Sequence, residues 1–114
     1  IDKVKFPKNL KTLDLGINFN HSIDNVKFPK SLKKLLLSEF FNHSIDYLPE
    51  SLEELQSGHF LEKSIKNLPD NIKNLTIMSR KCQIYKLPKK LERLKCSKKN
   101  VKCEIPNNIK FIEN

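Results

Sequence analysis

The sequence has no alanine, no tryptophan and no long uninterrupted run of apolar side chains. A membrane-spanning helix needs about 18 consecutive apolar residues or more, so we expect no such helix and no membrane among the partners. The chain begins with Ile1 rather than methionine, so its natural start is expected to lie elsewhere and the lack of a secretory leader decides little. Leu, Ile, Val and Phe nevertheless recur throughout the 114 residues, which predicts one folded domain rather than disorder.

Cysteine is scarce and confined to one end, at Cys82, Cys96 and Cys103. An odd count is not typical of a disulfide framework, and these spacings match no zinc-binding pattern. We therefore expect reduced thiols and a cytoplasmic location. All three fall in or near apolar positions, which favours buried thiols that act as small hydrophobic groups. A Cys82–Cys103 bridge between neighbouring repeats and a reactive thiol stay open as alternatives.

Acidic residues are outnumbered, with 13 Asp and Glu against 22 Lys and Arg and a net charge of +9. Such a balance is compatible with an acidic protein partner, nucleic acid or another anionic surface. The heavy use of Lys, Asn, Ile and Phe, together with the absence of alanine, also fits the codon bias of an AT-rich genome. Net charge alone is therefore a weak guide to the partner.

Six prolines divide the sequence into repeats of about 20 residues. They are Pro7, Pro29, Pro49, Pro69, Pro88 and Pro106. Behind each proline follows the pattern P-x-x-L-x-x-L-x-L or a close variant of it, and an apolar residue stands directly before each proline. One repeat cannot bury these groups alone, whereas stacked repeats cover one another and form a continuous core.

The L-x-L step of each repeat has the period of two that is typical of a β-strand. We predict a short parallel strand at about the fifth to ninth residue after each proline, and a return segment of loop or 3₁₀ turns. The fold class is therefore a repeat solenoid, with parallel strands on one face and irregular chain on the other. In the last repeat the same spacing predicts Ile112 in the strand leucine position and Asn114 as a polar end.

The pattern P-x-x-L-x-x-L-x-L with a period near 20 is similar to the leucine-rich repeat. More narrowly, the segments FPKSLKKLLLSEFFNHSID and LPESLEELQSGHFLEKSIKNL resemble FNIP repeats, which are leucine-rich-repeat relatives of social amoebae and of giant viruses of amoebae. If the protein is viral, the resemblance implies a location in the host cytoplasm or the virion. The F-N-x-x-I core occurs as Phe19–Ile23 and Phe41–Ile45, and it fades after residue 60. Because the first residues align with a point inside a repeat, we expect 1–114 to be one solenoid within a longer array, or a partner to cover that end.

The resemblance also implies a function, since some family members carry an F-box ahead of the repeats. This chain would then be the substrate-recognition arm of a ubiquitin-ligase adaptor. No F-box-like helical segment occurs within these 114 residues, and the full gene sequence would test this alternative.

The segment FNHSID occurs twice and brings a histidine, a serine and an acid together in sequence. A catalytic triad needs its base held against the nucleophile, and adjacent loop residues seldom converge in that way. The motifs G-x-S-x-G, H-E-x-x-H and the P-loop are absent, so we expect neither an enzyme nor a cofactor or metal. His21 and His43 are expected about 5 Å apart on adjacent rungs. Asn20 and Asn42 are expected to bond the backbone of the next turn, with glycan attachment as an alternative.

The outward strand residues are the expected partner-binding surface of this solenoid. They form two columns, Thr12, Lys34, Glu54, Asn74 and Arg93, then Asp14, Leu36, Gln56, Thr76 and Lys95. Residues 80–102 include ten basic residues and a single acidic one, Glu92. The lysines assigned to a basic patch are Lys86, Lys89, Lys90, Lys98, Lys99 and Lys102. The leading hypothesis is a non-enzymatic protein-interaction module, and nucleic-acid binding by the basic half is an alternative.

Overall fold

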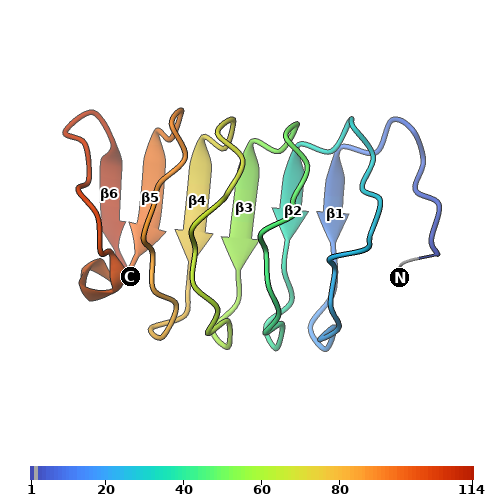
Figure 1. Cartoon of the computed structure of the whole chain (residues 1–114), viewed down its shortest axis with the longest axis horizontal. Helices are drawn as coiled ribbons and strands as arrows, with labels where there is room; N and C mark the ends of the chain where they lie inside the picture. The colour runs from blue at the N-terminus through green and yellow to red at the C-terminus, as the bar shows by residue number, and fades with distance from the viewer. Residues whose placement is uncertain (2) are drawn as a thin grey trace.

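The computed structural model describes residues 1 and 3–114, which form a solenoid of six parallel strands in one sheet (Figure 1). The strands are β1 (Thr12–Asp14), β2 (Lys34–Leu36), β3 (Glu54–Ser57), β4 (Asn74–Ile77), β5 (Arg93–Cys96) and β6 (Lys110–Glu113). They are ordered β1-β2-β3-β4-β5-β6, so each strand pairs with the next one in sequence. The predicted solenoid class is confirmed, and so are the strand positions in the first five repeats.

Each strand is preceded by the same turn, which the repeat proline begins. The amide of the third residue after every proline donates to that proline's carbonyl, with N···O distances of 3.1 to 3.3 Å in all six repeats. Proline suits the first position of such a turn because its ring fixes φ and no N–H is needed there. The turn sets the chain direction for the strand that follows, and in the first five repeats that strand begins five residues after the proline.

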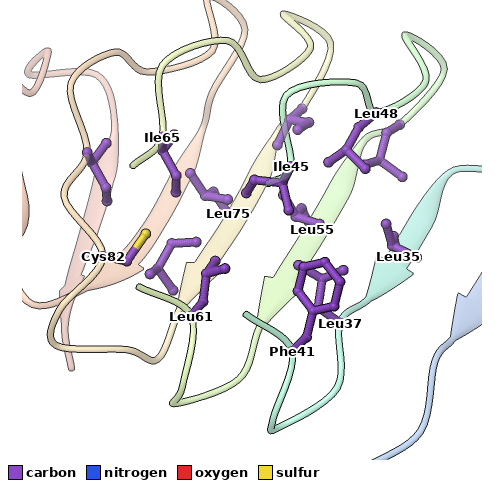
Figure 2. Close-up of a cluster of buried hydrophobic side chains, with 14 of the residues drawn as sticks. Leu35, Leu37, Phe41, Ile45, Leu48, Leu55, Leu61, Ile65, Leu75 and Cys82 are labelled. Atoms are coloured by element: carbon purple, nitrogen blue, oxygen red, sulfur yellow. The ribbon is translucent and has the colours of Figure 1, made fainter. Parts of the chain in front are cut away.

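The strand leucines form the centre of the core, and Figure 2 shows them beneath the return segments. Leu35, Leu55 and Leu75 are aligned by the strand register and are almost fully buried. Ile45 and Ile65 close the core from the return side. Burial of each such side chain stabilises the fold by about 2 kcal/mol relative to exposure, so the stacked rungs share one continuous hydrophobic core.

The return side is mainly extended chain. Ile65, Ile84 and Val101 pair in parallel as isolated bridges and begin a second ladder opposite the sheet. A 3₁₀ turn, η1 (Lys98–Asn100), follows β5. The part of the chain that the structure describes has no helix long and apolar enough to cross a membrane.

The last repeat departs from the predicted register by one residue. Leu94 pairs with Phe111 and Lys95 with Ile112, so Phe111 takes the strand leucine position and Ile112 points outward. The assignment of Ile112 to the core and of Asn114 to the end of the apolar pattern was therefore wrong.

The cause of this shift lies at the beginning of the strand. In earlier repeats two consecutive amides share one carbonyl, as Lys33 and Lys34 do with Lys11 at 2.8 and 2.9 Å. In the last repeat the amide of Lys110 alone bonds the carbonyl of Glu92, at 2.9 Å. The last repeat therefore has one residue fewer between its proline and its strand. Counting from Pro106 as in the earlier repeats places the core residue one position too late.

Candidate interaction surface

The outward face of the sheet carries both predicted columns in the predicted order. The strand register aligns Thr12, Lys34, Glu54, Asn74 and Arg93 in one row, and Asp14, Leu36, Gln56, Thr76 and Lys95 in the next. Lys110 and Ile112 extend these two rows. They were missed from the sequence because Phe111 and Ile112 are both apolar, so the apolar pattern alone does not decide which of them takes the core position.

Ion pairs divide this face into two parts. Lys34 Nζ lies 3.3 Å from Glu54 on the adjacent strand, and Lys33 Nζ lies 3.6 Å from Glu53 beside it. Exposed pairs of this kind stabilise the fold by less than about 1 kcal/mol, but they neutralise the charge on β2 and β3. Among residues 1 and 3–114, Arg93, Lys95 and Lys110 form no ion pair, so the face becomes cationic toward β5 and β6.

A shallow depression of about 250 Å³ lies on the same face. It is lined by Glu54, Asn74, Leu75, Thr76, Arg93, Lys95 and Ile112. An amide, a hydroxyl, two cations and an apolar side chain from β4, β5 and β6 therefore converge there, together with the carboxylate of Glu54 from β3, which is paired with Lys34. Such a surface can accept hydrogen bonds, donate them and bind a carboxylate, while Ile112 supplies an apolar contact.

The six lysines predicted as one basic patch fall into two groups. Lys86, Lys89 and Lys90 surround Pro88 ahead of β5, whereas the other three (Lys98, Lys99 and Lys102) follow β5. All six are exposed, and the four-residue strand separates the groups. The sequence cluster wraps around a rung because one repeat passes through every side of the solenoid.

The FNHSID segments form the bend after the strands and are tied by their asparagines. Asn20 Oδ1 accepts the amide N–H of Asn42 at 2.9 Å, and Asn42 Oδ1 accepts that of Glu62 at 2.9 Å. Phe19 and Phe41 stack with centroids 6.2 Å apart. The expected structural role of both asparagines is confirmed, since each bonds the backbone of the next turn.

The polar residues of FNHSID do not assemble a catalytic relay. Ser44 Oγ donates to Asp46 Oδ2 at 2.9 Å, whereas His43 Nε2 lies 3.3 Å from the main-chain carbonyl oxygen of Asn20. The imidazole therefore faces the neighbouring turn rather than the serine. Among residues 1 and 3–114, no group of three His, Cys, Asp or Glu side chains is arranged to hold a metal.

The cysteine side chains are free thiols and two of them belong to the core. Cys82 and Cys96 are fully buried, as expected, while Cys103 is half-buried. Burial, and then the neighbouring Cys96, raises the pKa of the Cys82 thiol from 9.0 to about 12. A thiol with so high a pKa stays protonated at neutral pH and is a poor nucleophile.

Comparison with known proteins finds a matching repeat family and a solved structure with a similar fold. The FNIP Repeat family model matches residues 1–40 and 19–59. Among solved structures, the chain is similar to the one titled "The crystal structure of CroV588 a novel circular LRR protein structure", with a TM-score of 0.76 and 27% sequence identity. That match covers 95% of this chain and 18% of the other chain, so this chain spans under a fifth of that protein's length. No curated protein matches the chain.

Proposed function

The chain belongs to the FNIP repeat family, and from that premise we propose that it is a protein-interaction module without catalytic activity. Its partner docks on the outward face of β4, β5 and β6. Repeat solenoids of this kind typically bind other proteins, because stacked strands present a long regular surface. The observation that carries the proposal is the depression where Asn74, Thr76, Arg93, Lys95 and Ile112 converge.

The chemistry of this face favours an acidic partner. Arg93 and Lys95 have no ion pair among the described residues, so a carboxylate that reaches them displaces no internal partner. Asn74 and Thr76 add neutral hydrogen-bonding groups, which confer specificity rather than affinity. Ile112 provides the apolar contact that desolvates the centre of an interface.

Site-specific photocrosslinking tests the proposal. A photoreactive side chain replaces Thr76 within the depression in one variant and Lys66 on the return side in a matched control. We expect one discrete partner protein to crosslink to the photoreactive side chain at position 76. The double substitution Arg93→Glu with Lys95→Glu should reduce the amount of that protein captured. Equal crosslinking from both positions, or capture that survives both charge reversals, would contradict a strand-face site.

Nucleic acid is the second candidate, since the same unpaired cations could contact phosphates. A salt titration separates the two, because affinity for nucleic acid falls steeply and linearly on a logarithmic scale as counterions are released. Duplex and single-stranded oligonucleotides that fail to bind at low salt would exclude this candidate. Binding with a slope equivalent to several phosphates would instead favour it over an acidic protein.

A further inference from the structure

A second exposed surface follows the strands, on the turns that lead into the return side. It consists of the eleventh residue after each of the first five prolines, and we name it the turn ridge: Asn18, Phe40, Phe60, Arg80 and Lys99. Main-chain bonds hold its central part, since the amides of Phe40 and Phe60 donate to carbonyls of the preceding turn at 3.4 and 3.3 Å. Along the ridge the side chain changes from an amide at its start to two aromatic rings and then to two cations.

The aromatic part is a solvent-exposed stacked pair. The rings of Phe40 and Phe60 lie with centroids 5.0 Å apart and planes 25° apart. They remain 45% and 52% exposed, whereas the neighbouring Phe41 is buried in the core. Paired exposed phenylalanines on a strongly charged surface lose hydrophobic stabilisation unless something covers them.

A hollow opens beside Phe60, and its cause is a change of one residue type. A Cβ on Gly58 would lie 2.7 Å from the carbonyl oxygen of Ser38 and even closer to Cα of Glu39, so glycine lets the third turn pack tightly on the second. Met78 stands at the equivalent position, nine residues after its proline, in the fourth turn. A methionine side chain does not fit into so close an approach, and within residues 1 and 3–114 no main-chain hydrogen bond like those of Phe40 and Phe60 joins Arg80 to the third turn.

The resulting hollow has a volume of about 270 Å³ and is lined by His59, Phe60, Glu62, Met78, Arg80 and Lys81. Phe60 and Met78 supply its apolar lining, while Arg80 and Lys81 supply two cations. Lys81 Nζ lies 3.4 Å from Glu62, but Arg80 is exposed and forms no ion pair within residues 1 and 3–114. Lys99, also exposed, continues the cationic side one rung further along.

We propose that the turn ridge binds a short acidic segment of a partner protein, with one apolar side chain in the hollow between Phe60 and Met78. Carboxylates that follow the apolar residue contact Arg80 and Lys99. Adjacent rungs lie about 4.8 Å apart and extended chain advances about 3.3 Å per residue, so Lys99, which lies between one and two rungs past the hollow, is reached roughly two to three residues beyond the apolar anchor. The proposal rests on the protein-binding function above but uses a different surface.

Single-stranded nucleic acid also binds aromatic and basic residues, but the ridge favours a peptide. Phe40 and Phe60 already stack on each other, so their facing surfaces are not open to bases. Glu39 contacts His59 at the aromatic end, and Glu62 lines the hollow itself. These two carboxylates repel a phosphate backbone, whereas an apolar peptide side chain carries no charge toward them.

A fluorescent peptide with one phenylalanine followed by a run of aspartates is the probe, and its binding is measured by fluorescence anisotropy. We expect Phe60→Ser and Arg80→Glu each to weaken binding by about tenfold or more, equivalent to the loss of one good contact. The controls are Tyr47→Ser, which removes an aromatic ring that is 72% exposed elsewhere, and Lys27→Glu, which changes the net charge equally. Circular dichroism verifies that each variant is folded.

The outcomes separate this site from the strand face. Arg93→Glu with Lys95→Glu should weaken capture of the strand-face partner while the peptide still binds the ridge. The ridge proposal is overturned if Phe60→Ser binds the probe as tightly as Tyr47→Ser does. It is also overturned if an oligothymidylate competes more strongly than the peptide in a Phe60-dependent manner, because the ridge would then bind nucleic acid.

Discussion

Single polar side chains join neighbouring turns of this solenoid where its backbone bends. Asn20 and Asn42 each accept an amide N–H from the next turn, and Ser31 and Ser51 each donate to a carbonyl of the preceding one, at 2.6 and 2.7 Å. A tight bend leaves backbone groups without partners in the strand ladder, and these side chains satisfy them. The bond partner lies about one repeat away, so an asparagine or serine at a fixed place in the repeat can be recognised from spacing alone.

The variant Asn42→Ala should lower the free energy of unfolding by about 1 kcal/mol, because the amide N–H of Glu62 loses its acceptor. Urea denaturation of the variant and the parent measures the change. Asn25→Ala is the matched control, since Asn25 is exposed and makes no side-chain hydrogen bond within the described part of the chain. An equal loss in both variants would contradict the bridging role.

The buried thiol of Cys82 should make stability fall at alkaline pH. Burial raises its pKa from 9.0 to about 12, so the unfolded chain loses this proton at a lower pH than the folded chain does. The contribution is complete below pH 9.0 and is lost as pH rises toward about 12. Urea midpoints measured across this window should fall less for Cys82→Val than for the parent. If the urea midpoints of Cys82→Val and of the parent fall equally with pH, other groups cause the fall. The control Cys103→Ser should show a dependence of midpoint on pH closer to that of the parent.

At the scale of the element, each strand alternates between core residues and residues on the outward face. Leu35 is fully buried, while Leu36 points outward and is only partly covered. The last strand shows how the alternation can be assigned wrongly, because one residue fewer at its start exchanges the two faces. Local alternation identified this strand, but its register depended on hydrogen bonds to the preceding rung.

Adjacent leucines of β2 test the alternation. Leu35→Asp should abolish cooperative unfolding, because it places an unpaired charge between rungs. Leu36→Asp makes the same chemical change one residue later, on the solvent side, and should leave the protein folded. Circular dichroism during thermal denaturation distinguishes them, and a folded Leu35→Asp variant would refute the repeat register.

The same comparison in β6 tests the corrected register. Phe111→Asp should destabilise the protein more than Ile112→Asp, because Phe111 packs against the core while Ile112 is exposed. Denaturant midpoints for the two variants provide the measurement. The reverse order would restore the register expected from the proline spacing.

For the whole molecule, stability should vary along the solenoid axis. β3 and β4 are covered by a rung on each side and their leucines are almost fully buried, while Leu13 of β1 and Phe111 of β6 are only partly buried. In a repeat protein each rung gains its stability from its own packing and from its two neighbours. Terminal rungs therefore open more easily than central ones.

Hydrogen–deuterium exchange read by mass spectrometry should resolve this gradient. We expect amides of β3 and β4 to exchange at least about tenfold more slowly than those of β1 and β6, which corresponds to about 1.4 kcal/mol of opening free energy. Peptides from the proline turns serve as an internal reference, since the same turn occurs in every repeat. Uniform exchange along the chain would mean that the solenoid opens as one cooperative unit.

The sequence by itself determined the repeat, the strand positions of the first five repeats, the core leucines, the two outward columns and the role of Asn42. Each of these depends on a pattern that recurs every 20 residues or so, and stacking converts equal positions into neighbours. Tertiary structure decided three other features: the register of Phe111, the separation of the basic lysines, and the hollow that places Phe60 beside Arg80. The register and the hollow depend on small departures from the repeat, namely one residue fewer before β6 and Met78 at the position that Gly58 holds one repeat earlier, whereas the lysines separate because one repeat passes through every side of the solenoid. Such departures matter only when adjacent turns pack, because their effect is on the distance and register between rungs.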